Sequence, residues 1–197
     1  FGATRAGRRS ALGGEGTGDA LGVFINTLPL RVPVRDEIDL VAWLADIRAR
    51  GRAQRDHEHT PLVRVREQSE LPKDAPLFET LFVFEQNILG TVLRRLGGAW
   101  AQRDFEIVRK TNFPLVLVAY GEDELLFEIE FDRRRFDDTA VARMLGHLAT
   151  ILRAFAHEPA RRVADVPMLT DAERRQLVVE WNDTARGPAP RATLHAL

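Results

Sequence analysis

The stretch that most constrains the fold of this chain runs from Leu21 to Arg31 and reads LGVFINTLPLR. Apolar and β-branched residues dominate it, which is typical of a strand buried in a sheet. Asn26 and Thr27 interrupt it with a carboxamide and a hydroxyl, and buried polar groups need hydrogen-bond partners. Two interpretations follow: a core strand whose polar side chains bond neighbouring backbone, or a strand that lines a substrate channel.

Charge and composition limit the classes of partner. The 197 residues include 28 basic and 29 acidic ones, so no net field draws the chain to nucleic acid or to an anionic membrane. The absence of cysteine excludes a disulfide framework and a thiolate zinc site. No apolar run approaches the roughly 20 residues that span a bilayer, and no secretory pattern opens the chain. We therefore expect a soluble, cytoplasmic bacterial protein, and the strong preference for arginine over lysine indicates a high-GC genome.

Helical periodicity predicts two long helices. The first begins near Leu40, where apolar residues recur at helical spacing, and the second carries a wide apolar stripe from Val141 to Phe155. An aspartate before each stripe is placed to cap the helix. The candidate caps are Asp36 or Asp39 for the first helix and Asp137 or Asp138 for the second.

Apolar, aromatic and β-branched runs predict strands, and the one over Leu125–Phe131 alternates between apolar and acidic residues as a half-exposed strand does. Leu77–Phe84 has the composition of a central strand, and Leu115–Tyr120 and Leu125–Phe131 flank a short turn that contains glycine. The last two runs therefore predict an antiparallel hairpin. Thr170 and Glu173 have the spacing of a capping box, which predicts a last short helix after them.

Residues 22–31 also resemble a known family signature. They match the pattern G-x-F-x-N-T-x-x-x-R of nonribosomal peptide synthetase condensation domains, and a pattern with this many fixed positions is specific. Three further stretches resemble signatures of the same family, in the family's order. They are His57–Leu62 (H-E-H-x-P-L), Leu71–Phe78 with its P-L-F core, and Thr111–Leu115 (T-N-F-P-L).

The resemblance implies a chloramphenicol-acetyltransferase-like α/β fold, with a mainly antiparallel sheet and helices packed on one face. A complete domain of this family has two such lobes, and the matched signatures belong to the second. Residues 1–168 are therefore expected to be a C-terminal lobe that is incomplete at its N-terminus. Residues 169–197, which contain an L-T-x-x-E-R run followed by W-N-x-T, resemble a linker helix and the start of an adenylation domain.

In complete domains of the family, the two lobes enclose a tunnel in which a peptide bond is formed. Donor and acceptor aminoacyl or peptidyl thioesters enter it from opposite ends, each on the phosphopantetheine arm of a carrier protein. The implied partners are upstream and downstream peptidyl carrier proteins, the N-terminal lobe and the following adenylation domain, with no cofactor bound directly by this chain. Arg48, Arg52 and Arg55 share one face of the first predicted helix and form either a solvated surface or a docking surface for an acidic carrier protein.

The family's H-H-x-x-x-D-G motif, which supplies the catalytic histidine, is absent. No two of the five histidines are adjacent: they are His57, His59, His147, His157 and His195. We therefore predict no catalytic residue in this chain and no peptide-bond formation by the chain alone. The expected substrate-channel residues are Asn26, Thr27, Arg31 and Asn87, which would position a thioester or a pantetheine amide by hydrogen bonds. No metal site is expected, because a zinc site needs three or four ligands and the histidines of the H-E-H motif stand without a second cluster.

Two other functions stay open at this point. The first is a non-catalytic, condensation-like module that recruits partner enzymes to a synthetase, which a degenerate histidine motif in the upstream sequence would favour. The second is an epimerization domain, a sister enzyme. The F-I-N-T-L-P form of the signature and the adenylation-type linker argue against this second alternative.

Overall fold

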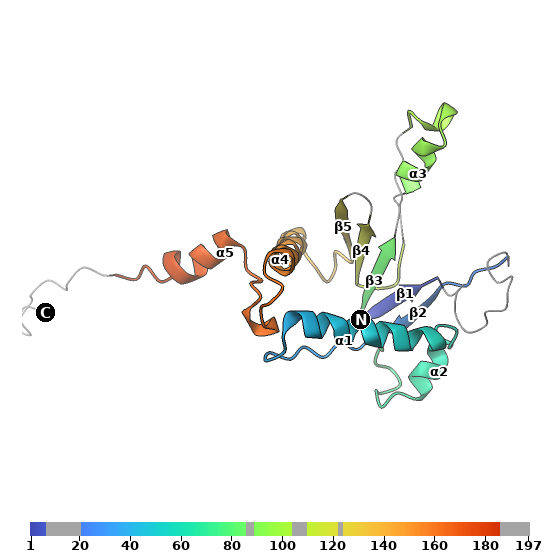
Figure 1. Ribbon diagram of the computed structural model, residues 1–197, viewed down its shortest axis with the longest axis horizontal. Helices are drawn as coiled ribbons and strands as arrows, with labels where there is room; N and C mark the ends of the chain where they lie inside the picture. The colour runs from blue at the N-terminus through green and yellow to red at the C-terminus, as the bar shows by residue number, and fades with distance from the viewer. Residues whose placement is uncertain (7–20, 86–88, 104–109, 122–123, 186–197) are drawn as a thin grey trace, which may run out of the picture.

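The computed structural model describes residues 1–6, 21–85, 89–103, 110–121 and 124–185, which are built around one five-stranded sheet (Figure 1). The strand order is β2-β1-β3-β4-β5. The strands are β1 (Gly2–Arg5), β2 (Asn26–Pro29), β3 (Thr80–Glu85), β4 (Leu115–Gly121) and β5 (Leu125–Phe131). The α-helices are α1 (Leu40–Ala53), α2 (Leu62–Glu67), α3 (Leu89–Arg95), α4 (Asp138–His157) and α5 (Asp171–Arg175).

Shorter helical turns complete the described part. They are η1 (Gln54–His57), η2 (Gly98–Trp100), η3 (Val163–Asp165) and the π-helical turn η4 (Gln176–Glu180). Among the described residues, no helix has the length and apolar character needed to cross a bilayer.

The expected α/β class is confirmed, but the sheet is mixed rather than mainly antiparallel. β1 pairs antiparallel with β2, and β4 with β5, whereas the pairs β1–β3 and β3–β4 are parallel. The connections explain the difference. Helices α1 and α2 lie between β2 and β3 in the chain, and α3 lies between β3 and β4. Connections of this length allow the chain to return and add a strand in parallel, whereas a tight turn forces the antiparallel hairpin of β4 and β5.

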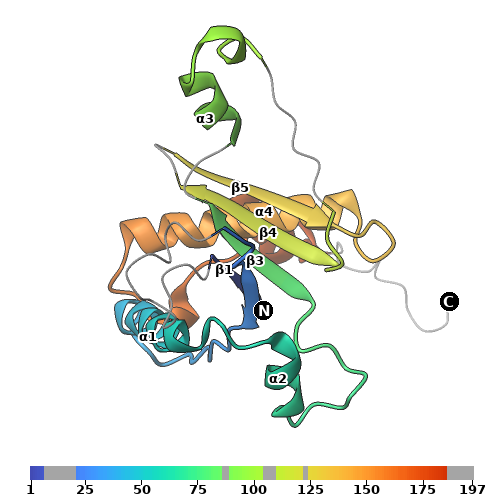
Figure 2. The same cartoon turned by 90° about the vertical axis from the view of Figure 1, so that its right-hand side faces the viewer.

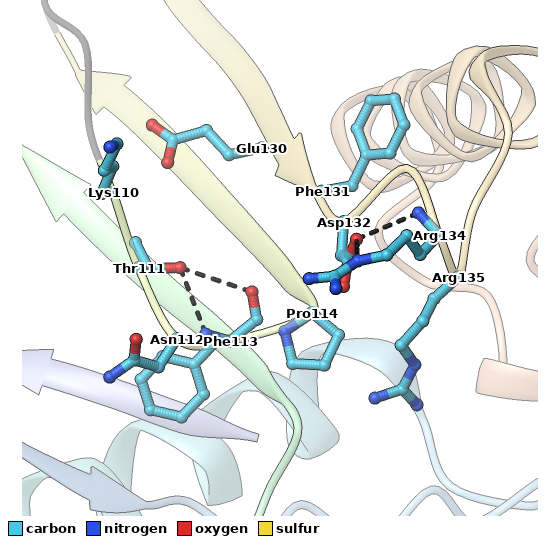
Figure 3. A pocket seen from close by; sticks show the side chains of 10 residues that line it. All are labelled: Lys110, Thr111, Asn112, Phe113, Pro114, Glu130, Phe131, Asp132, Arg134 and Arg135. Atoms are coloured by element: carbon cyan, nitrogen blue, oxygen red, sulfur yellow. Dashed lines mark hydrogen bonds and ion pairs between the residues drawn. The ribbon is translucent and has the colours of Figure 1, made fainter.

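The two faces of the sheet differ. Figure 2 shows α4 behind the sheet. On β5 the ring of Phe131 points toward α4, whereas the carboxylate of Glu130 points to the other side (Figure 3). Phe131 and Glu130 therefore show the expected alternation at the end of β5, with the aromatic ring turned toward α4. A buried cluster occupies the centre of the sheet: it comprises Leu81, Val116, Val118 and Tyr120.

Helix α1 begins where an aspartate caps it. Asp39 Oδ1 accepts hydrogen bonds from the backbone N–H groups of Val41 (2.9 Å) and Ala42 (3.2 Å), which selects Asp39 over Asp36 as the cap. Leu40 is 1% exposed, and its N–H donates to the Arg161 carbonyl at 2.8 Å. The rest of the predicted apolar stripe is not fully buried, so α1 is anchored mainly at its first turn.

The predicted strand over residues 21–31 is wrong in its first half. Leu21 is 100% exposed and Val23 is 90% exposed, and β2 begins only at Asn26. The reason is the pairing with β1: the last residue of β1, Arg5, lies opposite Asn26. Residues 21–25 therefore have no neighbouring strand among the described residues, and β-propensity alone does not bury a strand.

Local signals at the two later helices are confirmed. Asp137 Oδ1 accepts from the Ala140 N–H at 2.8 Å, which makes Asp137 the cap of α4. Thr170 and Glu173 form the predicted capping box at the start of α5.

Gly2 permits a close approach between β1 and an aromatic stack. A Cβ atom there would lie 2.6 Å from Phe78 Cδ2, and the Phe78 ring stacks on Phe113 with centroids 5.3 Å apart. We expect Gly2→Ala to lower the free energy of unfolding by about 1–3 kcal/mol, because the added methyl forces the stack apart. Urea denaturation measures the change.

Gly51→Ala is the matched control: its Cβ would meet only the end of the Arg5 side chain, at 3.5 Å. Alanine suits a helix better than glycine, so a loss of stability in this control equal to that of Gly2→Ala would contradict the packing argument.

Candidate functional site

Three of the four signature stretches meet at one groove between β2, η1 and α2. This signature groove has a volume of about 620 Å³ and a mainly apolar surface. Leu28 and Pro29 come from the first signature, His57 and Thr60 from the second, and Leu77 from the third. The remaining lining residues are Gln54, Arg64, Val65, Gln68 and Ser69. Segments that lie far apart in the chain thus build a single concave surface.

Asn26 ties two of these signatures together. Its Nδ2 donates to the backbone carbonyls of Glu58 (2.8 Å) and Thr60 (2.9 Å), and its Oδ1 accepts from the Thr27 N–H at 2.9 Å. Both amide hydrogens are therefore used inside the protein. These contacts match the first interpretation of the strand, in which its polar side chains bond neighbouring backbone. The two bonds donated by Asn26 hold the second signature against β2.

The four expected channel residues are not gathered at one point. Side chains alternate along a strand, so Thr27 lies on the face of β2 opposite to Asn26. The Thr27 Oγ1 atom is 3.4 Å from the Thr4 Oγ1 atom on β1. Arg31 lies just beyond β2 and is exposed, and within the described ranges its guanidinium has no hydrogen bond or ion pair. Asn87 falls outside the described residues, and the role of all four in positioning substrate stays a prediction.

Two polar residues at the groove have contacts that the sequence analysis did not predict: Gln54, which stands in no signature, and Glu58, which belongs to the H-E-H signature. Gln54 Nε2 donates to the Pro29 carbonyl at 2.7 Å, and its buried Oε1 has no hydrogen-bond partner in the described part of the chain. Glu58 is 9% exposed and lies 3.8 Å from the Nε of Arg5 on β1. Together they attach η1 and the following loop to β1 and β2, which fixes one wall of the groove.

A second pocket, also of about 620 Å³, opens between the start of β4 and the end of β5 (Figure 3). Its charges compensate one another. Arg134 Nε is 3.2 Å from Asp132 Oδ1, and Arg135 Nη1 is 2.9 Å from Glu79 Oε1. The pKa of Asp132 is lowered by hydrogen bonds from the backbone N–H and then from the guanidinium of Arg134. The pKa of Glu79 is lowered by the hydrogen bond and the positive charge of Arg135. Exposed pairs of this kind are common on protein surfaces, so the signature groove is the stronger candidate for binding.

The signature groove offers shape and hydrogen-bond groups rather than a catalytic constellation. In the ranges that the structure describes, His147 is the one histidine whose ring forms a hydrogen bond, and its partner Glu173 lies outside the groove. No group of three or more potential metal ligands occurs among the same residues. What the geometry supports is the binding and orientation of a largely apolar ligand.

Comparisons with known proteins identify the family of this chain. The family model described as Condensation domain matches residues 1–178. A linear gramicidin synthase from Brevibacillus parabrevis is 34% identical over 204 residues, which cover 99% of this chain and 4% of that protein. Chondramide synthase cmdD from Chondromyces crocatus is 32% identical over 182 residues, covering 92% of this chain and 5% of that protein. The chain thus spans only a small part of the curated relatives that it matches.

Solved structures show the same fold. A four-domain nonribosomal peptide synthetase, holo-AB3403 bound to AMP and glycine, matches with a TM-score of 0.70 at 16% identity, covering 88% of this chain and 14% of that one. The first condensation domain of the CDA synthetase matches with a TM-score of 0.58 at 15% identity, covering 86% and 37%. Given a family match over residues 1–178 and relatives more than 30% identical along nearly its whole length, this chain belongs to the condensation domain family of nonribosomal peptide synthetases.

Proposed function

We propose that residues 1–168 are the C-terminal lobe of a condensation domain and that residues 169–197 form a linker helix and the start of an adenylation domain. Two observations support this division. The chain corresponds to 37% of the separately crystallised CDA condensation domain, and the capping box at Thr170 starts a new helix after α4, at the expected position of a linker helix. The family match extends past this boundary and ends at residue 178, within the last helical segment.

In this role the chain contributes to peptide-bond formation between donor and acceptor aminoacyl or peptidyl thioesters. The observation that carries the proposal is the meeting of three family signatures at the signature groove. An apolar surface with a few polar groups suits a pantetheine arm or an aminoacyl group, which alternate methylene groups with amides. Holding a thioester in a reactive position lowers the barrier by orientation. The partners are the carrier proteins that deliver the two thioesters, the N-terminal lobe and the following adenylation domain.

The proton chemistry belongs to another part of the complete domain. Condensation requires the acceptor amine to lose a proton as it attacks the donor thioester carbonyl, with the thiolate of the donor arm as leaving group. The H-H-x-x-x-D-G motif does not occur in this sequence. We infer that the histidine that assists this step lies in the N-terminal lobe, and that the chain alone forms no peptide bond.

A non-catalytic recruiting module is the second candidate function. The complex of the X-domain and OxyB from teicoplanin biosynthesis matches this chain with a TM-score of 0.66 at 17% identity, covering 86% of this chain and 38% of that one. That likeness concerns the fold alone. The two candidates therefore differ in what the complete domain does to loaded carrier proteins.

Residues 1–197 and the complete domain from the same synthetase are expected to differ in an assay with two aminoacyl-loaded carrier proteins. The complete domain produces a dipeptide on the acceptor carrier, and residues 1–197 produce none, because the histidine motif is missing. Mass spectrometry of the carrier-bound species measures the product. A complete domain with its H-H-x-x-x-D-G motif intact but no product on verified carriers would contradict the condensation function and favour recruitment. Product formed by residues 1–197 would contradict the placement of the proton chemistry in the other lobe.

A further inference from the structure

One carboxylate joins the C-terminal segment to α4. Glu173 Oε2 accepts from the backbone N–H of Thr170 at 3.0 Å and from its hydroxyl at 2.8 Å. Glu173 Oε1 accepts from Arg143 Nε at 3.0 Å, and His147 Nε2 lies 2.9 Å from both carboxylate oxygens. These four residues are called the Glu173 cluster below. Two of them belong to α4 and two to the start of α5.

The cluster is shielded and strongly polar. The side chains of Glu173 and His147 are each 18% exposed. The hydrogen bonds from the Thr170 backbone and hydroxyl, joined by those from His147 and Arg143, lower the pKa of Glu173 to about 2. The carboxylate is therefore charged at neutral pH, and hydrogen bonds to a charged group are among the stronger ones in proteins.

The cluster also attaches the segment that follows it to the body of the lobe. In Figure 1, α5 projects from the body beside α4 and leads toward the C-terminus. Within the described ranges, the contacts of Glu173 with Arg143 and His147 are the only hydrogen bonds or ion pairs that join residues 171–185 to any residue before Thr170. The segment has internal bonds of its own: the capping box begins it, and Asn182 Nδ2 donates to the Leu177 carbonyl at 2.6 Å near its end.

We infer that the Glu173 cluster is a clamp that sets the direction in which the chain leaves this lobe. Glu173 has two tasks, since it caps α5 through Thr170 and docks α5 on α4 through Arg143 and His147. When the docking contacts to α4 break, residues 171–185 are free to swing away while the capping box remains. This inference does not depend on peptide-bond formation, and its test uses no substrate.

Limited trypsin digestion of the full chain tests the clamp, because Arg174 and Arg175 lie within α5 and both are exposed. Cleavage within a docked helix needs local opening. Replacing Arg143 or His147 by alanine removes a hydrogen-bond donor to Glu173 and leaves the capping box intact. We expect each variant to be cleaved after Arg174 or Arg175 several-fold faster than the wild type, and Glu173→Ala, which loses all the contacts, at least about tenfold faster.

Glu180→Gln is the matched control, because Glu180 is exposed on the same segment and its side chain has no partner in the described part of the chain. Its cleavage rate should equal that of the wild type. Hydrogen exchange of the β4 amides separates local release from global unfolding, and it should not change in Arg143→Ala or His147→Ala. If Glu173→Ala unfolds as a whole, Arg143→Ala and His147→Ala still decide the question. Wild-type cleavage rates in both of these variants would overturn the clamp and reduce Glu173 to a capping residue.

Discussion

Replacing Val65 by tryptophan in the complete domain is expected to lower kcat/KM for condensation by about 100-fold. Val65 lies on α2 and lines the signature groove with Leu28 and Leu77. An indole at this position fills the space between α2 and β2, so a thioester or pantetheine arm is displaced from its reactive position. Displacement of about 1 Å is enough for a loss of this size in a reaction that depends on orientation. Single-turnover kinetics with loaded carrier proteins measure the effect.

Val63→Trp is the matched control for this variant. Val63 is on the same helix, two residues away, and is 67% exposed outside the signature groove. We expect it to leave kcat/KM within about twofold of the wild type and to leave the unfolding transition in place, since exposed substitutions rarely change stability by more than about 0.5 kcal/mol. A folded Val65→Trp domain with wild-type kinetics would exclude the signature groove from the path of the substrate. Equal losses in both variants would point to a general effect of α2 on folding.

The sequence predicted those parts of the fold that depend on local signals. The apolar stripe of α4 with its Asp137 cap, the Asp39 cap of α1 and the β4–β5 hairpin all follow from residues close together in the chain. The order and direction of the strands did not follow, because β1 and β3 are parallel neighbours separated by β2, α1 and α2. Such pairing is decided by how the helices pack, which periodicity does not reveal.

The candidate site shows the same division. The signatures identified the right segments, and three of them meet at one groove, but the role of a single side chain depends on partners far away in the sequence. Gln54 carried no recognisable pattern, although its amide bonds β2 and lines the groove. The capping role of Glu173 was predicted from its spacing to Thr170, yet its contact with His147, 26 residues earlier, could not be read from spacing.

Asn26→Ala is expected to lower the free energy of unfolding by about 2–4 kcal/mol. The amide of Asn26 donates to two backbone carbonyls of the second signature, those of Glu58 and Thr60. Alanine leaves both carbonyls without this donor, and each unsatisfied, partly buried group costs about 1–3 kcal/mol. Urea denaturation of the complete domain measures the change. The same variant should also disturb the signature groove, because Thr60 is one of its lining residues.

The two interpretations of this asparagine make different predictions for kinetics and stability. If Asn26 acts by holding the second signature on β2, Asn26→Ala loses stability, and the activity that remains falls because the groove is deformed. If instead it bonds the substrate directly, the variant keeps its stability and loses kcat/KM alone. Thr27→Val is the control, since its hydroxyl has only a 3.4 Å contact with the Thr4 hydroxyl and should contribute less than about 1 kcal/mol. A stable but inactive Asn26→Ala domain would show that Asn26 binds the substrate directly. In that case its two internal hydrogen bonds would contribute nothing measurable to stability.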